Sequence, residues 1–214
     1  AGKLTFNVAA SDGSTSNSRT GLSLTGNPAN DTVDVSIGYG ASALIGLNSF
    51  TRAVSGMQVY GFFIAEQRRF DKTSATDGSY NGDIVYFGST TSMITGRIYH
   101  YNSSGNWELA NPNAAATSDG LLGVALGAAS DTNGVLLRGM VTLDRDPGAV
   151  GDVLFLNKDQ VADTGGTDRY GAATATSPNG NGDIVRIIGY CLDASNGQIW
   201  FNPDNTFVEY SVGD

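Results

Sequence analysis

From residue 83 to its end, the chain alternates short apolar runs with turn-rich segments, at a spacing of about 8–12 residues. The runs are bounded by Gly, Asn, Asp, Ser or Pro, which is typical of β-strands. Long helical segments do not alternate with them, so a doubly wound sheet is disfavoured. This rhythm predicts an all-β, antiparallel sandwich or barrel-type domain. The expected strands are residues 83–88, 96–101, 106–110, 121–127, 134–143, 152–157, 183–192, 197–202 and 207–211.

The amino-acid composition agrees with this prediction. The chain has 214 residues, and its 29 glycines are about twice the usual share of roughly 7%. Ser, Thr, Asn and Asp are abundant while Glu and Lys are scarce, which favours turns and strands over long helices. A chain of this length folds without disulfides, and Cys191 is its only cysteine. Since Cys191 lies in an apolar run, we expect a buried, unreactive thiol.

A repeat predicts internal symmetry. The pentapeptide NGDIV occurs at residues 81–85 and again at residues 181–185, and the similarity continues downstream. The sequence therefore predicts a duplicated β-unit, with copies near residues 81–110 and 181–211. Aligned without a gap, the downstream segments pair Gly96 with Gly197, Ile98 with Ile199, Tyr99 with Trp200 and Glu108 with Glu209, and Gly88 with Gly189 in the same register.

Turn chemistry is clearest at Asn196-Gly197 in the second copy. This dipeptide predicts a two-residue type I′ hairpin, because both central residues of that turn take positive φ. The first copy has a looser connection at residues 89–95. We therefore expect a strand, a tight turn and a strand around Asn196-Gly197.

The first 80 residues are less regular. The turn-rich segment 71–80 predicts a boundary between a β-rich N-terminal region, residues 1–78, and a C-terminal β domain, residues 79–214. In the N-terminal region we expect strands at residues 3–9 and 31–38, a short helix at residues 40–56 and a strand covered on both faces at residues 57–67.

The charge limits the class of partner. A formal net charge of −9 and a pI near 4.4 argue against nucleic-acid binding, which needs clustered Lys and Arg. The same charge repels acidic membrane surfaces and polyanions, and no apolar run is long enough to cross a membrane. Ala1 is a residue that would follow a removed initiator Met, so we expect synthesis and folding in the cytoplasm.

Few residues are candidates for chemistry, so we expect no catalytic site. His100 is the only histidine; it could serve a Ser-His-Asp arrangement, but its counterpart in the second copy is Phe201, which favours a structural role. A glycosidase needs two facing carboxylates. The candidate carboxylates are Asp144 with Asp146, and Glu108 with Glu209.

We also expect no resident cofactor. One histidine and one cysteine make a zinc site of the usual type improbable. Calcium is the best of the options, because residues 130–134 and 192–197 offer Asp, Asn and carbonyl oxygens in tight turns. Asp and Asn in such turns usually bond their own backbone, which favours a structural reading.

Aromatic residues gather in both copies of the repeat. They could form platforms on which sugar rings stack, although core packing is the commoner fate of aromatics on strands. Tyr99, Tyr101 and Trp107 are the candidate surface or glycan contacts in the first copy. The corresponding aromatics of the second copy are Trp200, Phe201, Phe207 and Tyr210.

Five sequence segments, taken in this order, carry a resemblance to a known class of proteins. They are residues 96–127, 134–143, 148–157, 177–192 and 199–210. In that order the segment from about residue 82 to the end resembles a region of bacteriophage and prophage structural proteins, especially fibres and capsid-associated appendages. The resemblance implies a compact β domain within a homotrimer. It also implies a structural or adhesive module rather than an enzyme, and it carries over no functional residue.

From this resemblance we expect a capsid-decorating or fibre-type subunit, made in the host cytoplasm and located in the virion. Its partners would be its own copies and a major capsid protein or tail component, with residues 1–78 as the candidate attachment part. A carbohydrate-binding adhesin module that recognises host-surface glycans is the alternative. A polysaccharide-cleaving enzyme is the third hypothesis, and it requires two carboxylates in one cleft.

Overall fold

The computed structural model describes residues 22–27, 32–37, 70–71 and 73–211, the first two ranges as backbone only. The chain divides into two compact units, Ala1–Ile64 and Ala65–Asp214. In the first unit, β1 (Leu22–Asn27) and β2 (Thr32–Ile37) pair as an antiparallel hairpin. The strand expected at residues 31–38 is thereby confirmed as β2. The elements expected at residues 3–9, 40–56 and 57–67 lie outside the described residues.

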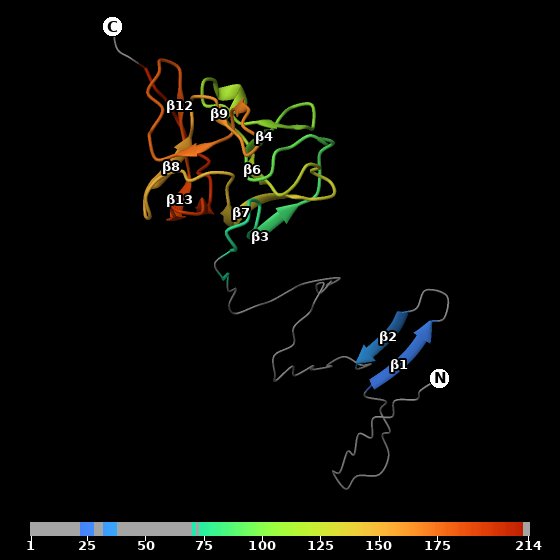
Figure 1. Ribbon diagram of the computed structural model, residues 1–214. Helices are drawn as coiled ribbons and strands as arrows, with labels where there is room; N and C mark the ends of the chain where they lie inside the picture. The colour runs from blue at the N-terminus through green and yellow to red at the C-terminus, as the bar shows by residue number, and fades with distance from the viewer. Residues whose placement is uncertain (1–21, 28–31, 38–69, 72, 212–214) are drawn as a thin grey trace, which may run out of the picture. The chain divides into compact units, whose positions relative to one another are not determined.

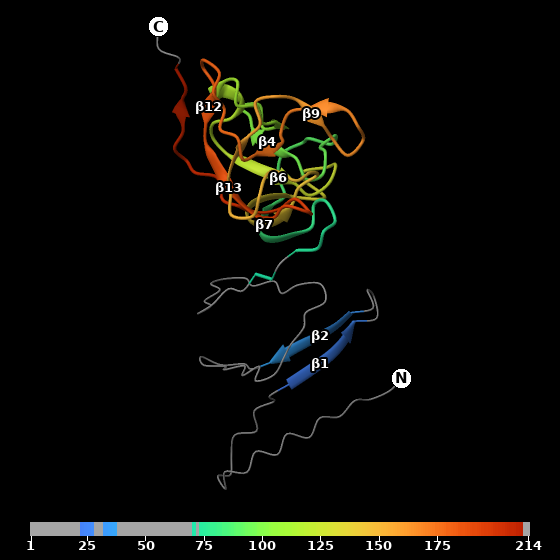
Figure 2. The ribbon, with the colours of Figure 1, turned by 60° about the vertical axis from the view of Figure 1, so that its left-hand side comes forward.

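The second unit consists of antiparallel strands, which confirms the predicted all-β sandwich or barrel-type fold (Figures 1 and 2). Among the described residues there is no α-helix, only one 3₁₀ turn, η1 (Ala115–Thr117). The strands are β3 (Tyr80–Val85), β4 (Ile98–Tyr101), β5 (Trp107–Leu109), β6 (Leu122–Ala125), β7 (Val135–Thr142), β8 (Val153–Leu156), β9 (Val161–Ala162), β10 (Asp168–Arg169), β11 (Ala173–Thr174), β12 (Ile184–Val185), β13 (Ile187–Asp193), β14 (Gln198–Phe201) and β15 (Val208–Glu209).

Most of these strands form one nine-stranded sheet, in the order β11-β8-β13-β14-β7-β6-β4-β5, with β3 pairing β7 off this path. The long strand β7 pairs with β3 along its length, with β6 near its start and with β14 near its end. A register shift between Asp83 and Ile84 bends the β3–β7 ladder. The sheet is curled, and Figure 1 shows β4 and β6 toward one side of the unit and β8 and β13 toward the other.

Two facing glycines let β3 and β7 approach closely. Gly82 lies opposite Gly139, whose φ is 139°. A Cβ added at Gly139 would lie 2.2 Å from the Asn81 carbonyl oxygen, and a Cβ added at Gly82 would lie 2.1 Å from the Arg138 carbonyl oxygen. Both positions therefore require glycine.

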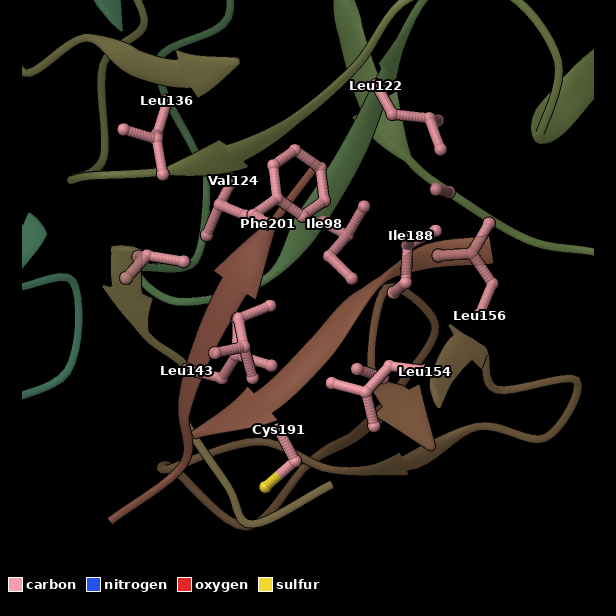
Figure 3. Close-up of a cluster of buried hydrophobic side chains, with 14 residues drawn as sticks. Ile98, Leu122, Val124, Leu136, Leu143, Leu154, Leu156, Ile188, Cys191 and Phe201 are labelled. Carbon is pink, nitrogen blue, oxygen red and sulfur yellow. The ribbon is translucent and has the colours of Figure 1, made fainter. Parts of the chain in front are cut away.

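The curled sheet encloses the main hydrophobic core (Figure 3). Its side chains come from strands at opposite ends of the sheet order, so the sheet closes over its own apolar face. Cys191 is one of these buried residues, and burial raises the pKa of its thiol, which confirms the expected buried cysteine. The buried members are Ile98, Ala110, Leu122, Val124, Leu136, Val141, Leu143, Leu154, Leu156, Ala173, Ile188, Cys191, Ile199 and Phe201.

The turn-rich segment expected as the domain boundary packs on the C-terminal unit. The Gln198 side chain donates to the Thr73 carbonyl oxygen at 2.6 Å, and the Thr142 hydroxyl donates to the Ser74 carbonyl oxygen at 2.6 Å. The Gly78 N–H also donates to the Thr142 carbonyl oxygen. These bonds satisfy buried polar groups. Residues 73–79 therefore belong to the C-terminal unit, and the division between the two units falls after Ile64, earlier in the chain than the expected boundary.

The two copies of the repeat agree in one part. Gly96 and Gly197 both have positive φ, and both lie against the segment that follows β7, where an added Cβ would touch Leu143. In each copy the glycine leads into a strand whose isoleucine, Ile98 or Ile199, is fully buried. The equivalence therefore holds for β4 and β14 and for the turn before each.

The flanking parts of the two copies differ from the predicted duplication. Residues 81–85 lie within β3, whereas in residues 181–185 Gly182 is in a turn and only Ile184 and Val185 form a strand. The strand with Glu108 pairs with β4, but the strand with Glu209 pairs with β12 instead of β14. Equivalent residues in the two copies thus pair with different strands, because strand pairing depends on which strands lie nearby.

The predicted two-residue turn at Asn196-Gly197 is wrong in length. Asp193 of β13 lies opposite Gln198 of β14, so residues 194–197 form a four-residue loop. The Asp193 carboxylate accepts the Ser195 N–H at 3.0 Å, which folds the loop earlier than the Asn-Gly pair alone would. Gly197 still has the expected positive φ, 64°.

Candidate binding surface

His100 is a buried structural side chain on β4. It is 3% exposed, and its Nε2 has no hydrogen-bond partner among the described residues. The Glu108 carboxylate oxygen lies 3.6 Å away on the paired strand. Burial lowers the pKa of His100, while Glu108 and Asp119 oppose that shift. Burial of the imidazole therefore disfavours its protonated form.

We expect His100→Phe to make stability less dependent on pH. A histidine pKa lowered in the folded state means that protonation favours unfolding. Its stabilising contribution is present above the unfolded pKa of about 6.5 and is lost as pH falls through and below that value. The free energy of unfolding, measured by urea denaturation between about pH 8 and about pH 5, should fall less steeply in the variant than in the native chain. Parallel slopes would contradict this assignment.

The carboxylates considered for a catalytic pair lie in different surroundings. Asp144 has a side chain 1% exposed and is ion-paired with Arg97, whose Nε donates to Oδ2 at 2.5 Å. Asp146 is exposed to solvent. Glu108 and Glu209 are both exposed, on strands that pair with different neighbours. The Asp144 carboxylate thus serves the fold, holding Arg97 in the core.

Arg97 is the hub of a buried polar network. Beyond Asp144, its guanidinium donates to four backbone carbonyl oxygens, two on each side of the β9–β10 hairpin. The desolvation of a fully buried arginine is offset by this complete set of acceptors. The arginine therefore ties the hairpin to β4. The acceptors are the carbonyls of Val161, Ala162, Arg169 and Tyr170.

The turns considered for calcium bond their own backbone. In the first, the Asn133 side-chain oxygen accepts the Ala129 N–H at 3.0 Å, and Asp131 accepts the Thr132 hydroxyl at 3.1 Å. In the second, Asp193 accepts the Ser195 N–H. No group of three or more His, Cys, Asp or Glu residues suited to a metal is found in the part of the chain that the structure describes.

The expectation that Tyr99 and Trp107 contact glycans is wrong. Tyr99 is 3% exposed and Trp107 is 1% exposed, and both belong to a second apolar cluster under residues 87–93. Their polar atoms are bonded inside the protein. The Tyr99 hydroxyl accepts the Ile94 N–H at 2.7 Å, and the Trp107 indole N–H donates to the Phe87 carbonyl at 2.9 Å. Tyr101, the third candidate, is half-buried against the rings of Phe87 and Trp107.

Trp200 occupies the repeat position of Tyr99 but lies on the outer face of the sheet. Its neighbours on β14, Ile199 and Phe201, are fully buried, so the alternation of a strand turns Trp200 outward. Its cross-strand partner Tyr190 is 45% exposed on the same face. The Phe70 ring packs edge-on against Trp200, with centroids 5.9 Å apart.

Two cavities on this outer face adjoin at Arg138 of β7. The first, of about 230 Å³, is lined by Phe70, Asp83, Arg138 and Trp200. The second, of about 390 Å³, has the buried residue Arg186 in its lining. It is lined by Gly120, Leu121, Leu122, Leu137, Arg138, Arg186, Asn202, Pro203 and Asn205. Of these lining residues, Trp200 is a candidate from the sequence, whereas Arg138 and Arg186 are not. The available signal is a charged residue, Arg138, in the middle of the apolar run 134–143.

A third hollow, of about 230 Å³, is apolar and lies where β15 meets β12 and β13. Val208 is 67% exposed there, Phe207 is 40% exposed and Ile187 is 36% exposed. Asp204 is its one lining carboxylate, and that group already accepts bonds from Thr206. We call this region the C-terminal apolar patch. Its lining residues are Phe155, Val185, Ile187, Asp204, Thr206, Phe207 and Val208.

Comparisons with known proteins found nothing similar to this chain, so the candidate binding surface is interpreted from its own geometry. No family model matches the chain, and no match to it was found among curated proteins or solved structures. None of the helices in the described part of the chain has the length and apolar character needed to cross a membrane.

Proposed function

We propose that this chain is a structural protein of a bacteriophage virion, a capsid-decorating or fibre-type subunit that forms a homotrimer and has no enzymatic role. The order of five strand-and-turn phrases from residue 96 to residue 210 supports the class of protein. The observation that carries the assembly is the C-terminal apolar patch, because exposed apolar surface of this kind marks interaction sites.

A second copy of the chain is the occupant that the charge distribution favours. Each copy carries a net charge of −9, so two copies repel each other over most of their surfaces. The C-terminal apolar patch has a single lining carboxylate, Asp204, and two or three copies can meet there with little repulsion. Cyclic assembly repeats one such contact and also covers sheet edges.

Buried polar side chains support a mechanical role. Arg97, Arg186 and Gln198 are each at most 3% exposed, and each donates to the backbone of a loop that is distant in the sequence. Such bonds fix loops onto the sheet without disulfides. A subunit on the outside of a particle benefits from loops that resist local opening. Within the expected attachment part, residues 1–78, the unit Ala1–Ile64 is the candidate that attaches to a major capsid protein or tail component, since residues 73–78 pack on the C-terminal unit.

We expect Val208→Asp to dissociate the assembly. Moving a carboxylate into an apolar interface carries a desolvation penalty, and the dissociation constant should rise more than about tenfold, equivalent to about 1.4 kcal/mol. Sedimentation equilibrium should give a mass near three times 22.2 kDa for the native chain and a lower average mass for the variant.

Val150→Asp is the matched control, because Val150 is 69% exposed and Val208 is 67% exposed. Val150 does not line the C-terminal apolar patch, so its variant should keep the native mass. A native chain that sediments as a monomer at micromolar concentration would overturn the proposal. If both variants dissociated equally, the C-terminal apolar patch would not be the subunit interface, and this assignment would be wrong.

A further inference from the structure

We propose that the two adjoining cavities at Arg138 form one groove that binds a neutral saccharide, with one sugar ring on Trp200 and its neighbour beside Arg186. The groove and the C-terminal apolar patch have no lining residue in common, although residues 202–206 contribute to both. Glycan binding and sedimentation mass are separate measurements, so the saccharide site and the homotrimer are tested independently.

The aromatic end of the groove suits the apolar face of a sugar ring. Trp200 is half-buried, so its ring is fixed by the sheet while one part remains accessible. Phe70 meets it at an interplanar angle of 66°, and the two rings form a corner rather than a flat wall. Aromatic rings of this kind contribute apolar contact area at a small entropic cost. Asp83 also lines this end of the groove and gives it a negative charge beside Arg138.

The other end supplies fixed hydrogen-bond donors. Arg138 is exposed, and its guanidinium makes no hydrogen bond or ion pair with the described residues. Arg186 is 3% exposed and is held rigidly: Nε donates to the Asp204 carbonyl, and Nη1 donates to the carbonyls of Ser118 and Gly120. Its remaining amino group, Nη2, has no acceptor among the described residues. A buried arginine held in this way keeps two N–H donors for a ligand in the cavity.

The rest of this end has the mixed character of a sugar site. Asn202 and Asn205 carry amides that can both donate to and accept from hydroxyl groups. Leu121, Leu137 and Pro203 form an apolar wall against which a ring can lie. A cavity of about 390 Å³ lies within the range of about 300–1,000 Å³ usual for small-molecule sites.

The charge around the groove favours a neutral ligand over an acidic one. Asp83 lines the first cavity, and Asp119 and Asp204 lie close enough to influence the pKa of Arg186. These three carboxylates offset the two arginines, and the net charge of −9 repels anions at long range. Arginines balanced in this way act as hydrogen-bond donors rather than as an anion trap.

The test is a glycan array of neutral and acidic oligosaccharides, probed with the labelled full-length chain and followed by fluorescence titration of the best neutral glycan. Trp200 is the half-exposed tryptophan and Trp107 is buried, so binding at the groove should change the emission of Trp200. Arg138→Gln should weaken binding by about tenfold or more, because it removes donors from both cavities. Trp200→Leu should weaken binding similarly and abolish the emission change.

Lys158→Gln is the matched control, because it removes a positive charge that lies outside both cavities. Its affinity should stay within about twofold of native. Thermal unfolding of each variant checks that the fold is kept. The inference is overturned if no neutral glycan on the array binds, if only acidic glycans bind, or if Arg138→Gln and Trp200→Leu bind as well as Lys158→Gln.

Discussion

Arg97→Met should lower the free energy of unfolding by about 3–5 kcal/mol, the usual cost of removing one partner from a buried ion pair. The side chain of Arg97 is fully buried, and that of Asp144 is 1% exposed. Methionine fills a similar volume but leaves the carboxylate without its cation. It also leaves four carbonyl oxygens of the β9–β10 hairpin without their donor. For a domain with a total stability of about 5–15 kcal/mol, this loss is large.

The Arg97→Met loss should diminish at low pH, because the unpaired Asp144 carboxylate becomes neutral there. Burial already raises the pKa of Asp144 against the opposing effect of Arg97, so removing Arg97 raises that pKa further. Urea unfolding at about pH 7 and about pH 4 measures both the loss and its pH dependence. Arg169→Gln, which breaks the exposed pair with Asp163, is the control and should change stability far less. A small, pH-independent effect of Arg97→Met would contradict the network.

Gly139→Ala should destabilise the sheet by about 2–6 kcal/mol. Two separate costs add: about 1–3 kcal/mol for a non-glycine residue in a strained backbone region, and about 1–3 kcal/mol for overpacking. The φ of Gly139 is 139°, and the new Cβ would lie 2.2 Å from the Asn81 carbonyl oxygen. The β3–β7 ladder would have to separate at the point where the sheet bends.

Gly151→Ala separates these two costs. Gly151 has a φ of 90°, but an added Cβ there has no atom within 4 Å. Its variant should lose only the backbone part, about 1–2 kcal/mol. Thermal and urea unfolding of both variants give the comparison. If the two alanine variants were equally stable, the close approach of β3 and β7 would not be a feature of the folded protein.

The strands of the C-terminal unit could be predicted because each is bounded by residues with strong turn preferences. Eight of the nine expected runs from residue 83 onward contain a strand, β4 to β8 and β12 to β15, and the run 83–88 overlaps the second half of β3. The two-residue strands β9, β10 and β11 were missed, because they lack an apolar run and depend on tertiary bonds. Arg97 illustrates such tertiary bonds, because its four carbonyl acceptors lie 64 to 73 residues away in the chain. Contacts between residues so far apart cannot be predicted from the local sequence.

The exposure of aromatic residues could not be predicted from the repeat. Tyr99 and Trp200 share one repeat position, yet Tyr99 is buried and Trp200 is half-buried on the outer face. The difference arises from what covers each strand. The cluster containing Met93 and Trp107 covers β4, whereas the outer face of β14 is covered near Trp200 by Phe70. The burial of a side chain depends on the segments that pack over it, so equivalent residues in two copies of a repeat can differ in solvent exposure.

Residues 71–80 show the same limit for polar residues. Their composition is typical of a linker and predicts a domain boundary there. In the structure, their carbonyls accept bonds from Gln198 and Thr142, two polar side chains that are 3% and 0% exposed. A turn-rich segment can thus complete a core by satisfying buried donors, which composition alone does not reveal.

If the proposed virion role is right, purified phage particles whose genome carries the gene for this chain contain the chain itself, and quantitative mass spectrometry of those particles is the direct test. We expect peptides of the chain in the particles at a fixed ratio to the major capsid or tail protein, in copy numbers that are multiples of three. Particles that are complete and infectious without the chain's peptides would contradict it.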